Sequence, residues 1–177
     1  MKPAASLLLA AGLAGCSGPY DDLAKDFASK GEPQGQRTSV SAMTLVSNRH
    51  EGAFNYNGVI TVSLAANTIE IRPTSLASFF LGGLDLPAGR ISGCSMTCFG
   101  VDDQHADLLF ESHGAEISFD GAAEFIDWCW RNDLPLISGA NRRDWLYAGG
   151  TLPGKAAYVP VPRDEYDRQA LQACRGF

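Results

Sequence analysis

The sequence between residues 59 and 72 places the strongest constraint on the fold. Within residues 59–64, the side chains from Ile60 to Leu64 alternate between apolar and hydroxyl, which is the period of a strand with one buried face. A short segment suited to a turn follows, and residues 68–72 alternate again, with Ile69 and Ile71 on the same side. This pattern predicts an antiparallel hairpin with one apolar face.

Further segments have the composition of strands, and helical spacing occurs at three places. The additional strand-like segments are 40–46, 84–92, 94–99, 106–112 and 115–119, and residues 76–81 form an apolar run that ends at Gly82-Gly83. After Asp120, an expected N-cap, apolar residues recur at helical spacing, so we expect an amphipathic helix over residues 121–132. Shorter helices are expected over residues 22–29 and 164–174. The sequence therefore predicts a mainly β, α+β fold of about seven antiparallel strands followed by an amphipathic helix.

The order of these elements resembles the pleckstrin-homology-like superfold. The likeness covers residues 55–132: Tyr56-Asn57-Gly58 leading into the hairpin, the Phe79-Phe80 segment, the 106–119 hairpin and then the helix. It implies two orthogonal sheets with the helix closing one open end. An unrelated antiparallel β-sandwich is the alternative. Phosphoinositide binding, known for some of these domains, requires a basic pocket, and this sequence has no such cluster.

The beginning of the chain has the features of a processing signal. A charged Lys2 and an apolar run precede Leu13-Ala14-Gly15-Cys16, which resembles the lipobox of bacterial lipoproteins. This resemblance implies cleavage before Cys16 and acylation of Cys16. Ser17 resembles the pattern that directs lipoproteins to the outer membrane in a Gram-negative host, on its periplasmic face. The alternatives are an ordinary secretory signal or a short buried helix that holds a cysteine.

These features divide the chain into four parts. We expect a signal peptide at 1–15, the lipidated cysteine with a tether and short helix at 16–38, a β-rich core with its helix at 39–133, and an extended tail with a C-terminal helix at 134–177. The formal net charge of −6 argues against nucleic-acid binding and against electrostatic docking to anionic lipid. The predicted membrane partner would therefore be held through acyl chains.

Four cysteines remain beyond Cys16, namely Cys94, Cys98, Cys129 and Cys174. In an oxidising compartment an even number predicts disulfides, and four cysteines allow three connectivities. We favour Cys94–Cys98 with Cys129–Cys174. The first pair conflicts with the strand expected there, because residues four apart on a strand lie about 13 Å apart, beyond disulfide reach. Either residues 95–97 turn tightly or Cys94 and Cys98 do not pair.

An aromatic and basic region follows the amphipathic helix. It comprises Trp128, Trp130, Arg142, Arg143, Trp145 and Tyr147. Trp, Tyr and Arg are enriched where proteins bind one another, so the region is a candidate partner surface. The alternative, which we favour, is that the tail covers the exposed face of its own helix. Trp128 and Trp130 lie on different sides of that helix, so we expect only one of them in the core.

The sequence predicts no enzyme, cofactor or metal site. Asp102, Asp103, His105 and Asp107 are the densest set of ligand-type side chains, but a solvated turn explains them equally. His50 and His113 complete the set of imidazoles, and no nucleophile-elbow motif accompanies them. We expect His113 to serve a turn and His50 to lie in a polar connector.

Together these features predict a membrane-anchored, non-catalytic envelope lipoprotein that binds a protein or peptide. One alternative is an inhibitor or immunity-type lipoprotein that presents Asp102 and Asp103 to a basic active site of an envelope hydrolase. The other alternative is a small hydrolase.

Overall fold

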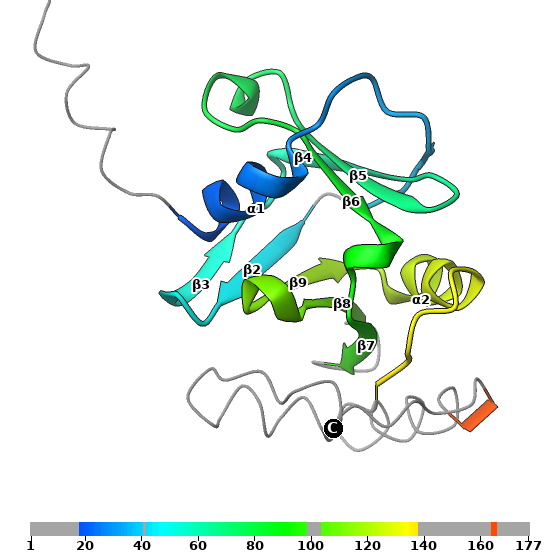
Figure 1. The fold of residues 1–177 in the computed structure, drawn as a ribbon. Helices are drawn as coiled ribbons and strands as arrows, with labels where there is room; N and C mark the ends of the chain where they lie inside the picture. The colour runs from blue at the N-terminus through cyan, green and yellow to red at the C-terminus, as the bar shows by residue number, and fades with distance from the viewer. Residues whose placement is uncertain (1–17, 41, 99–103, 138–163, 166–177) are drawn as a thin grey trace, which may run out of the picture.

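The described residues up to 137 fold into two antiparallel sheets with one helix packed at each end (Figure 1). The computed structural model describes residues 18–40, 42–98, 104–137 and 164–165. The first sheet contains, in spatial order, β1 (Gln36–Arg37), β4 (Ile60–Leu64), β5 (Thr68–Pro73) and β6 (Leu84–Pro87). The second contains β3 (His50–Asn55), β2 (Met43–Ser47), β9 (Ala115–Asp120), β8 (Gln104–Phe110) and β7 (Gly93–Cys98).

The hairpin of β4 and β5 is confirmed in its expected register. Val62 lies opposite Ile71 and Leu64 opposite Ile69, so the apolar side chains share one face. Val62, Ile69 and Ile71 are completely buried. They belong to one core that also includes residues of the second sheet, such as Leu45 and Ile117. The mainly β sandwich follows from this single core between two apolar faces.

Helix α1 (Pro19–Phe27) closes one end of the sandwich. It contacts β2 of one sheet and β6 of the other, and its buried side chains Tyr20, Leu23 and Phe27 enter the common core. Leu23 and Phe27 are four residues apart and therefore lie on one helical face, as expected. The helix begins earlier than predicted, at Pro19, and its N-cap is Gly18.

Helix α2 (Ala122–Arg131) lies at the other end, against β7 and β8. The sequence correctly predicts this helix, but its N-cap is Gly121 and not Asp120. Gly121 has φ of 92°, a conformation that a side chain disfavours. Asp120 instead accepts a hydrogen bond from the backbone N–H of Ala42 and so ties the start of β2 to the end of β9.

Three local predictions are wrong. Strand β3 includes His50, which was expected in a connector. The apolar run of residues 76–81 lies in a loop with a short 3-10 helix, η1 (Ala77–Phe79). The predicted two-residue turn at His113-Gly114 is longer, because the 3-10 helix η3 (Glu111–His113) precedes Gly114. A third 3-10 helix, η2 (Ala88–Arg90), interrupts the predicted strand over residues 84–92.

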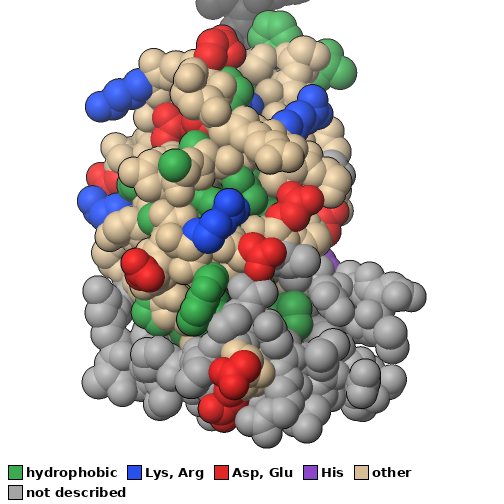
Figure 2. All heavy atoms as spheres, turned by 90° about the vertical axis from the view of Figure 1, so that its right-hand side faces the viewer, with side chains coloured by type: hydrophobic (Ala, Val, Ile, Leu, Met, Phe, Trp, Pro, Cys, Tyr) green, Lys and Arg blue, Asp and Glu red, His purple; other side chains and the backbone are tan. Residues whose placement is uncertain are grey.

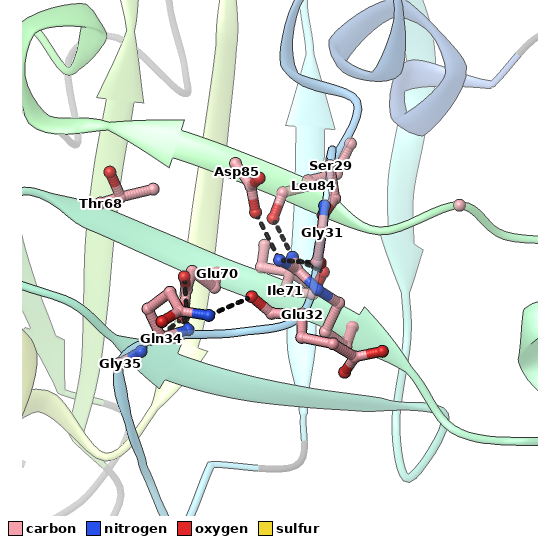
Figure 3. A network of polar contacts seen from close by, with 12 residues as sticks. Ser29, Gly31, Glu32, Gln34, Gly35, Thr68, Glu70, Ile71, Leu84 and Asp85 are labelled. Carbon is pink, nitrogen blue, oxygen red and sulfur yellow. Dashed lines mark hydrogen bonds and ion pairs between the residues drawn. The ribbon is translucent and has the colours of Figure 1, made fainter.

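The segment between α1 and β1 crosses the outer face of the first sheet (Figure 3). Glu70 points away from the core and its carboxylate accepts hydrogen bonds from the backbone N–H groups of Gln34, at 2.9 Å, and Gly35, at 2.8 Å. Arg72 donates to the carbonyl oxygens of Leu84 and Gly31 and forms an ion pair of 2.7 Å with Asp85. These contacts fix the path of the chain that leads into β1.

The end of the described core joins the second sheet. Leu136 forms a parallel bridge with Cys94, and the N–H of Ile137 donates to the carbonyl oxygen of Cys94. The predicted helix over residues 164–174 lies outside the described residues except for its first two positions. The kinship with the pleckstrin-homology-like superfold stays a prediction.

Candidate functional site

Helix α2 is bonded covalently to the second sheet. Cys129 forms a disulfide with Cys94 of β7, with a Cα–Cα distance of 6.5 Å, and both residues are completely buried. The favoured pairing of Cys94 with Cys98 is therefore wrong, as is that of Cys129 with Cys174. Strand β7 is extended from Gly93 to Cys98, so its two cysteines lie too far apart to form a disulfide with each other. Cys129 is bonded to Cys94 and so cannot pair with Cys174.

The same helix is hydrogen-bonded to the first sheet. The indole N–H of Trp128 donates to the carbonyl oxygen of Ala65 at 2.6 Å, and the Asn132 side-chain amide donates to that of Ala66 at 3.0 Å. Both acceptors lie in the turn between β4 and β5. Helix α2 therefore connects the two sheets, by a disulfide on one side and by Trp128 and Asn132 on the other.

A cleft of about 760 Å³ lies between α2 and the end of the first sheet. Its lining residues come from β1 and the chain just after it, from the end of β4 and the β4–β5 turn, and from α2: Gln36, Thr38, Leu64, Ala65, Ala66, Glu124, Asp127, Trp128, Trp130 and Arg131. We call this the α2 cleft. Four of the helical residues, at positions 124, 127, 128 and 131, have the spacing of a single helix face, which turns toward β1.

The two tryptophans of α2 have different environments, as predicted. Trp128 is 1% exposed and belongs to the core, whereas Trp130 is 49% exposed and lies at the cleft. Of the predicted partner surface, the structure thus brings Trp128 and Trp130 to one cleft. Arg142, Arg143, Trp145 and Tyr147 lie outside the described residues, so the alternative that the tail covers this helix face also stays a prediction.

The α2 cleft combines apolar surface with charges of both signs. Leu64 and the tryptophans supply apolar area, and the exposed Glu124, Asp127 and Arg131 supply charge. Figure 2 shows the face of the molecule on which α2 lies, where acidic and basic side chains surround patches of hydrophobic ones. Such a mixture suits a polypeptide segment, whose backbone, apolar and charged groups all need partners.

Sequence reasoning missed most of this site. The helical spacing of Glu124, Asp127 and Arg131 is visible in the sequence, but nothing in it shows which element the helix faces. That element is β1, two exposed residues whose pairing with β4 depends on Gly35. A Cβ atom at Gly35 would come within 2.4 Å of the backbone of Leu64 and Ala65, so only glycine fits there.

Two histidines attach α1 to the second sheet. His50 Nε2 lies 2.9 Å from Asp22, and His113 Nε2 lies 2.8 Å from Asp26. Hydrogen bonds from Lys25 and then from His50 lower the pKa of the Asp22 carboxyl to about 2. The His113 ring is buried and packs on Phe27, which confirms a structural place for it at the β8–β9 turn.

The contacts of His113 include a serine, and so resemble a hydrolase triad in composition. Ser112 Oγ lies 2.9 Å from His113 Nδ1, opposite the nitrogen that contacts Asp26. In serine hydrolases a buried carboxylate orients the imidazole and the serine faces a substrate cleft. Here the Asp26 side chain is 55% exposed, and none of the three residues lines the α2 cleft. We therefore assign these contacts to the attachment of α1.

The acidic set around residue 105 is divided by the structure. Asp107 is completely buried in β8 and accepts a 2.6 Å hydrogen bond from Ser118, while His105 is partly exposed in the same strand. Asp102 and Asp103 lie outside the described residues. Within the described ranges, no group of three His, Cys, Asp or Glu side chains is arranged to hold a metal ion.

Comparison with known proteins leaves the α2 cleft as the main guide to function. No protein-family model matches the chain, and no curated protein matches it. Among the described residues, no helix is both long enough and apolar enough to cross a membrane.

Proposed function

We propose that this protein is a lipid-anchored, non-catalytic envelope protein that binds an extended segment of a protein or peptide partner in the α2 cleft. The observation that carries the proposal is the position of the cleft beside the edge strand β1. A strand at a sheet edge can pair with an added segment, and neighbouring pockets then select its side chains.

The lining of the cleft indicates the chemistry of the segment. An apolar side chain of the partner would pack on Leu64 and Trp130, above the buried Trp128. Glu124 and Asp127 outnumber Arg131, and the whole chain is acidic, so a basic residue beside the apolar one is favoured.

The rigidity of the cleft supports a binding role. Its wall, α2, is held to both sheets by the Cys94–Cys129 disulfide and by the Trp128–Ala65 hydrogen bond. A preformed site loses little conformational entropy when a ligand binds, which improves affinity.

The anchoring part of the proposal depends on the Leu13-Ala14-Gly15-Cys16 sequence. The resemblance to a lipobox supports acylation of Cys16, which is two residues before the first described residue. Incorporation of labelled palmitate into the wild-type protein, and its loss in Cys16→Ser, tests this part. A wild-type protein that carries no acyl chain would contradict it.

The binding part is tested with peptides selected from a displayed random library on the purified protein. We expect selected peptides to combine an apolar and a basic residue, and to bind Trp130→Ala and Glu124→Ala at least tenfold more weakly than wild type. The matched control is Leu76→Ser, a substitution at another exposed apolar residue, distant from the cleft. Equal affinity for wild type and Trp130→Ala would exclude the α2 cleft as the site.

A further inference from the structure

The loop between β5 and β6 exposes an unusual amount of apolar surface. Leu76, Phe79 and Phe80 are 79%, 81% and 78% exposed, and they are the most exposed large apolar side chains in the part of the chain that the structure describes. All three belong to or flank η1. Figure 1 places this loop at the top of the molecule, and Figure 2 shows hydrophobic side chains projecting at the same end.

The loop is also free of charge. Residues 73–84 contain no Asp, Glu, Lys, Arg or His. The charged residues that flank them, Arg72 and Asp85, form an ion pair with each other at the base of the loop. Moving the loop into an apolar medium would therefore not require any charged side chain of the loop to be removed from water.

Several polar groups of the loop are hydrogen-bonded within the loop itself. The N–H of Ser78 donates to the carbonyl oxygen of Thr74, and those of Phe80 and Leu81 donate to that of Ala77. The hydroxyl of Ser78 donates to the carbonyl oxygen of Ser75. Lipid offers no hydrogen-bond partners, so backbone that enters a bilayer must be satisfied internally. These internal hydrogen bonds lower the cost of moving that part of the loop into lipid.

The loop lies close to the proposed lipid anchor. The Tyr20 hydroxyl donates to the carbonyl oxygen of Gly82 at 2.5 Å, and the N–H of Ser29 donates to that of Gly83 at 2.8 Å. Both bonds tie the end of the loop to α1 and the residues that follow it. Cys16 is four positions before Tyr20, so the chain can separate them by about 14 Å at most. Acyl chains on Cys16 would enter the bilayer within about 14 Å of the Tyr20 backbone, whose side chain is hydrogen-bonded to the end of the loop.

From these observations we propose that the loop of residues 74–82 inserts into the lipid bilayer as a second membrane contact, with Leu76, Phe79 and Phe80 among the acyl chains. This inference rests on the proposed anchoring through Cys16. It also defines how the protein is oriented relative to the membrane. Strand β5 separates the loop from the β4–β5 turn that lines the α2 cleft, a length of roughly 17 Å at about 3.4 Å per residue. With the loop inserted, the cleft faces away from the membrane.

The test uses the acylated full-length mature protein in vesicles of phosphatidylethanolamine and phosphatidylglycerol that carry a carbene-generating acyl chain. After illumination, mass spectrometry locates the lipid adducts. We expect them on residues 74–82, and we expect the double variant Phe79→Ser/Phe80→Ser to reduce their yield there at least tenfold. Because both side chains are exposed, this variant should keep the thermal unfolding transition of the wild type.

Trp130→Ser is the matched control for an exposed aromatic side chain elsewhere. It should retain the adducts on residues 74–82 and lose peptide binding, whereas the loop variant should do the reverse. The mass of the protein reports acylation separately, so a protein without acyl chains would contradict the anchoring proposal. An acylated protein without adducts on the loop overturns the inference made here and leaves the anchor intact. Cross-linking of the loop to a second protein in place of lipid would also overturn it.

Discussion

The indole N–H of Trp128 donates a hydrogen bond of 2.6 Å to the carbonyl oxygen of Ala65, 63 residues earlier in the chain. This bond joins α2 to the turn of the central hairpin and sets one side of the α2 cleft. Since Trp128 is 1% exposed, water cannot easily replace the donor if it is removed.

Replacement of Trp128 by Phe should therefore leave the Ala65 carbonyl without its partner and reduce the size of the buried ring. We expect the free energy of unfolding to fall by about 2–4 kcal/mol, from the lost hydrogen bond and the cavity together. Urea denaturation followed by circular dichroism measures the change. The control is Trp130→Phe, because Trp130 is half exposed in the wild type. Its free energy of unfolding should differ from that of the wild type by less than about 1 kcal/mol. Equal losses in the two variants would contradict the role given to Ala65.

The Cys94–Cys129 disulfide should stabilise the fold chiefly by restricting the unfolded chain. Its sequence separation is 35 residues, for which the chain-entropy model gives about 4 kcal/mol. We expect the double variant Cys94→Ala/Cys129→Ala to lose about 2–4 kcal/mol and to become insensitive to the reductant at this position. If wild type and variant unfold at the same urea concentration under oxidising conditions, the bond does not form in solution.

The elements that follow from short-range patterns could be predicted from the sequence. The β4–β5 hairpin has strict alternation, and α2 has helical spacing that also separates Trp128 from Trp130. Strand β3 was missed because His50 to Asn55 lacks alternating branched residues, and it forms by pairing with β2, which has them. The exposure of residues 76–81 could not be predicted, because an apolar run usually indicates burial, whereas here three of its large side chains face solvent.

The candidate site could be predicted only in part, for a related reason. Trp130 and the charged face of α2 are visible in the sequence, but the cleft exists because the tertiary fold places α2 opposite β1 and the β4–β5 turn. The disulfide shows the same limit: spacing could exclude Cys94–Cys98, since both lie on an extended strand, but could not select Cys129 as the partner.

The contact of Asp22 with Lys25 and His50 should make stability depend on pH in the acid range. The pKa of Asp22 is lowered from 3.8 to about 2 in the folded protein, so its carboxylate stabilises the fold fully above about pH 4. This contribution is lost as the pH falls from about 4 to about 2. We expect Asp22→Asn to be less stable than wild type at neutral pH, and the difference to disappear near pH 2.

Urea denaturation at several pH values measures that difference. The control is Asp21→Asn, which changes the neighbouring exposed carboxylate. Its free energy of unfolding should stay close to that of the wild type at every pH. A gap between wild type and Asp22→Asn that stays constant down to pH 2 would show that the ion pairs of Asp22 do not contribute to folding.

Glu70 should determine the position of β1, and through it the shape of the α2 cleft. Its carboxylate accepts hydrogen bonds from the N–H groups of Gln34 and Gly35, directly before β1 (Figure 3). In Glu70→Gln an amide NH₂ would face these donors in place of one acceptor oxygen. Hydrogen bonds to charged groups contribute about 1.5–3 kcal/mol, so we expect a loss of that order in unfolding free energy.

The local effect separates this role of Glu70 from general destabilisation. Hydrogen exchange at the amides of Gln34 and Gly35 should accelerate in Glu70→Gln more than exchange in the second sheet does. Glu32→Gln, at an exposed position of the same segment, is the control and should leave both rates unchanged. Because Gly35 packs on Leu64 and Ala65, release of this segment should also weaken peptide binding in the α2 cleft. Unchanged exchange at Gln34 and Gly35 would mean that the contacts of Arg72 hold the segment without Glu70.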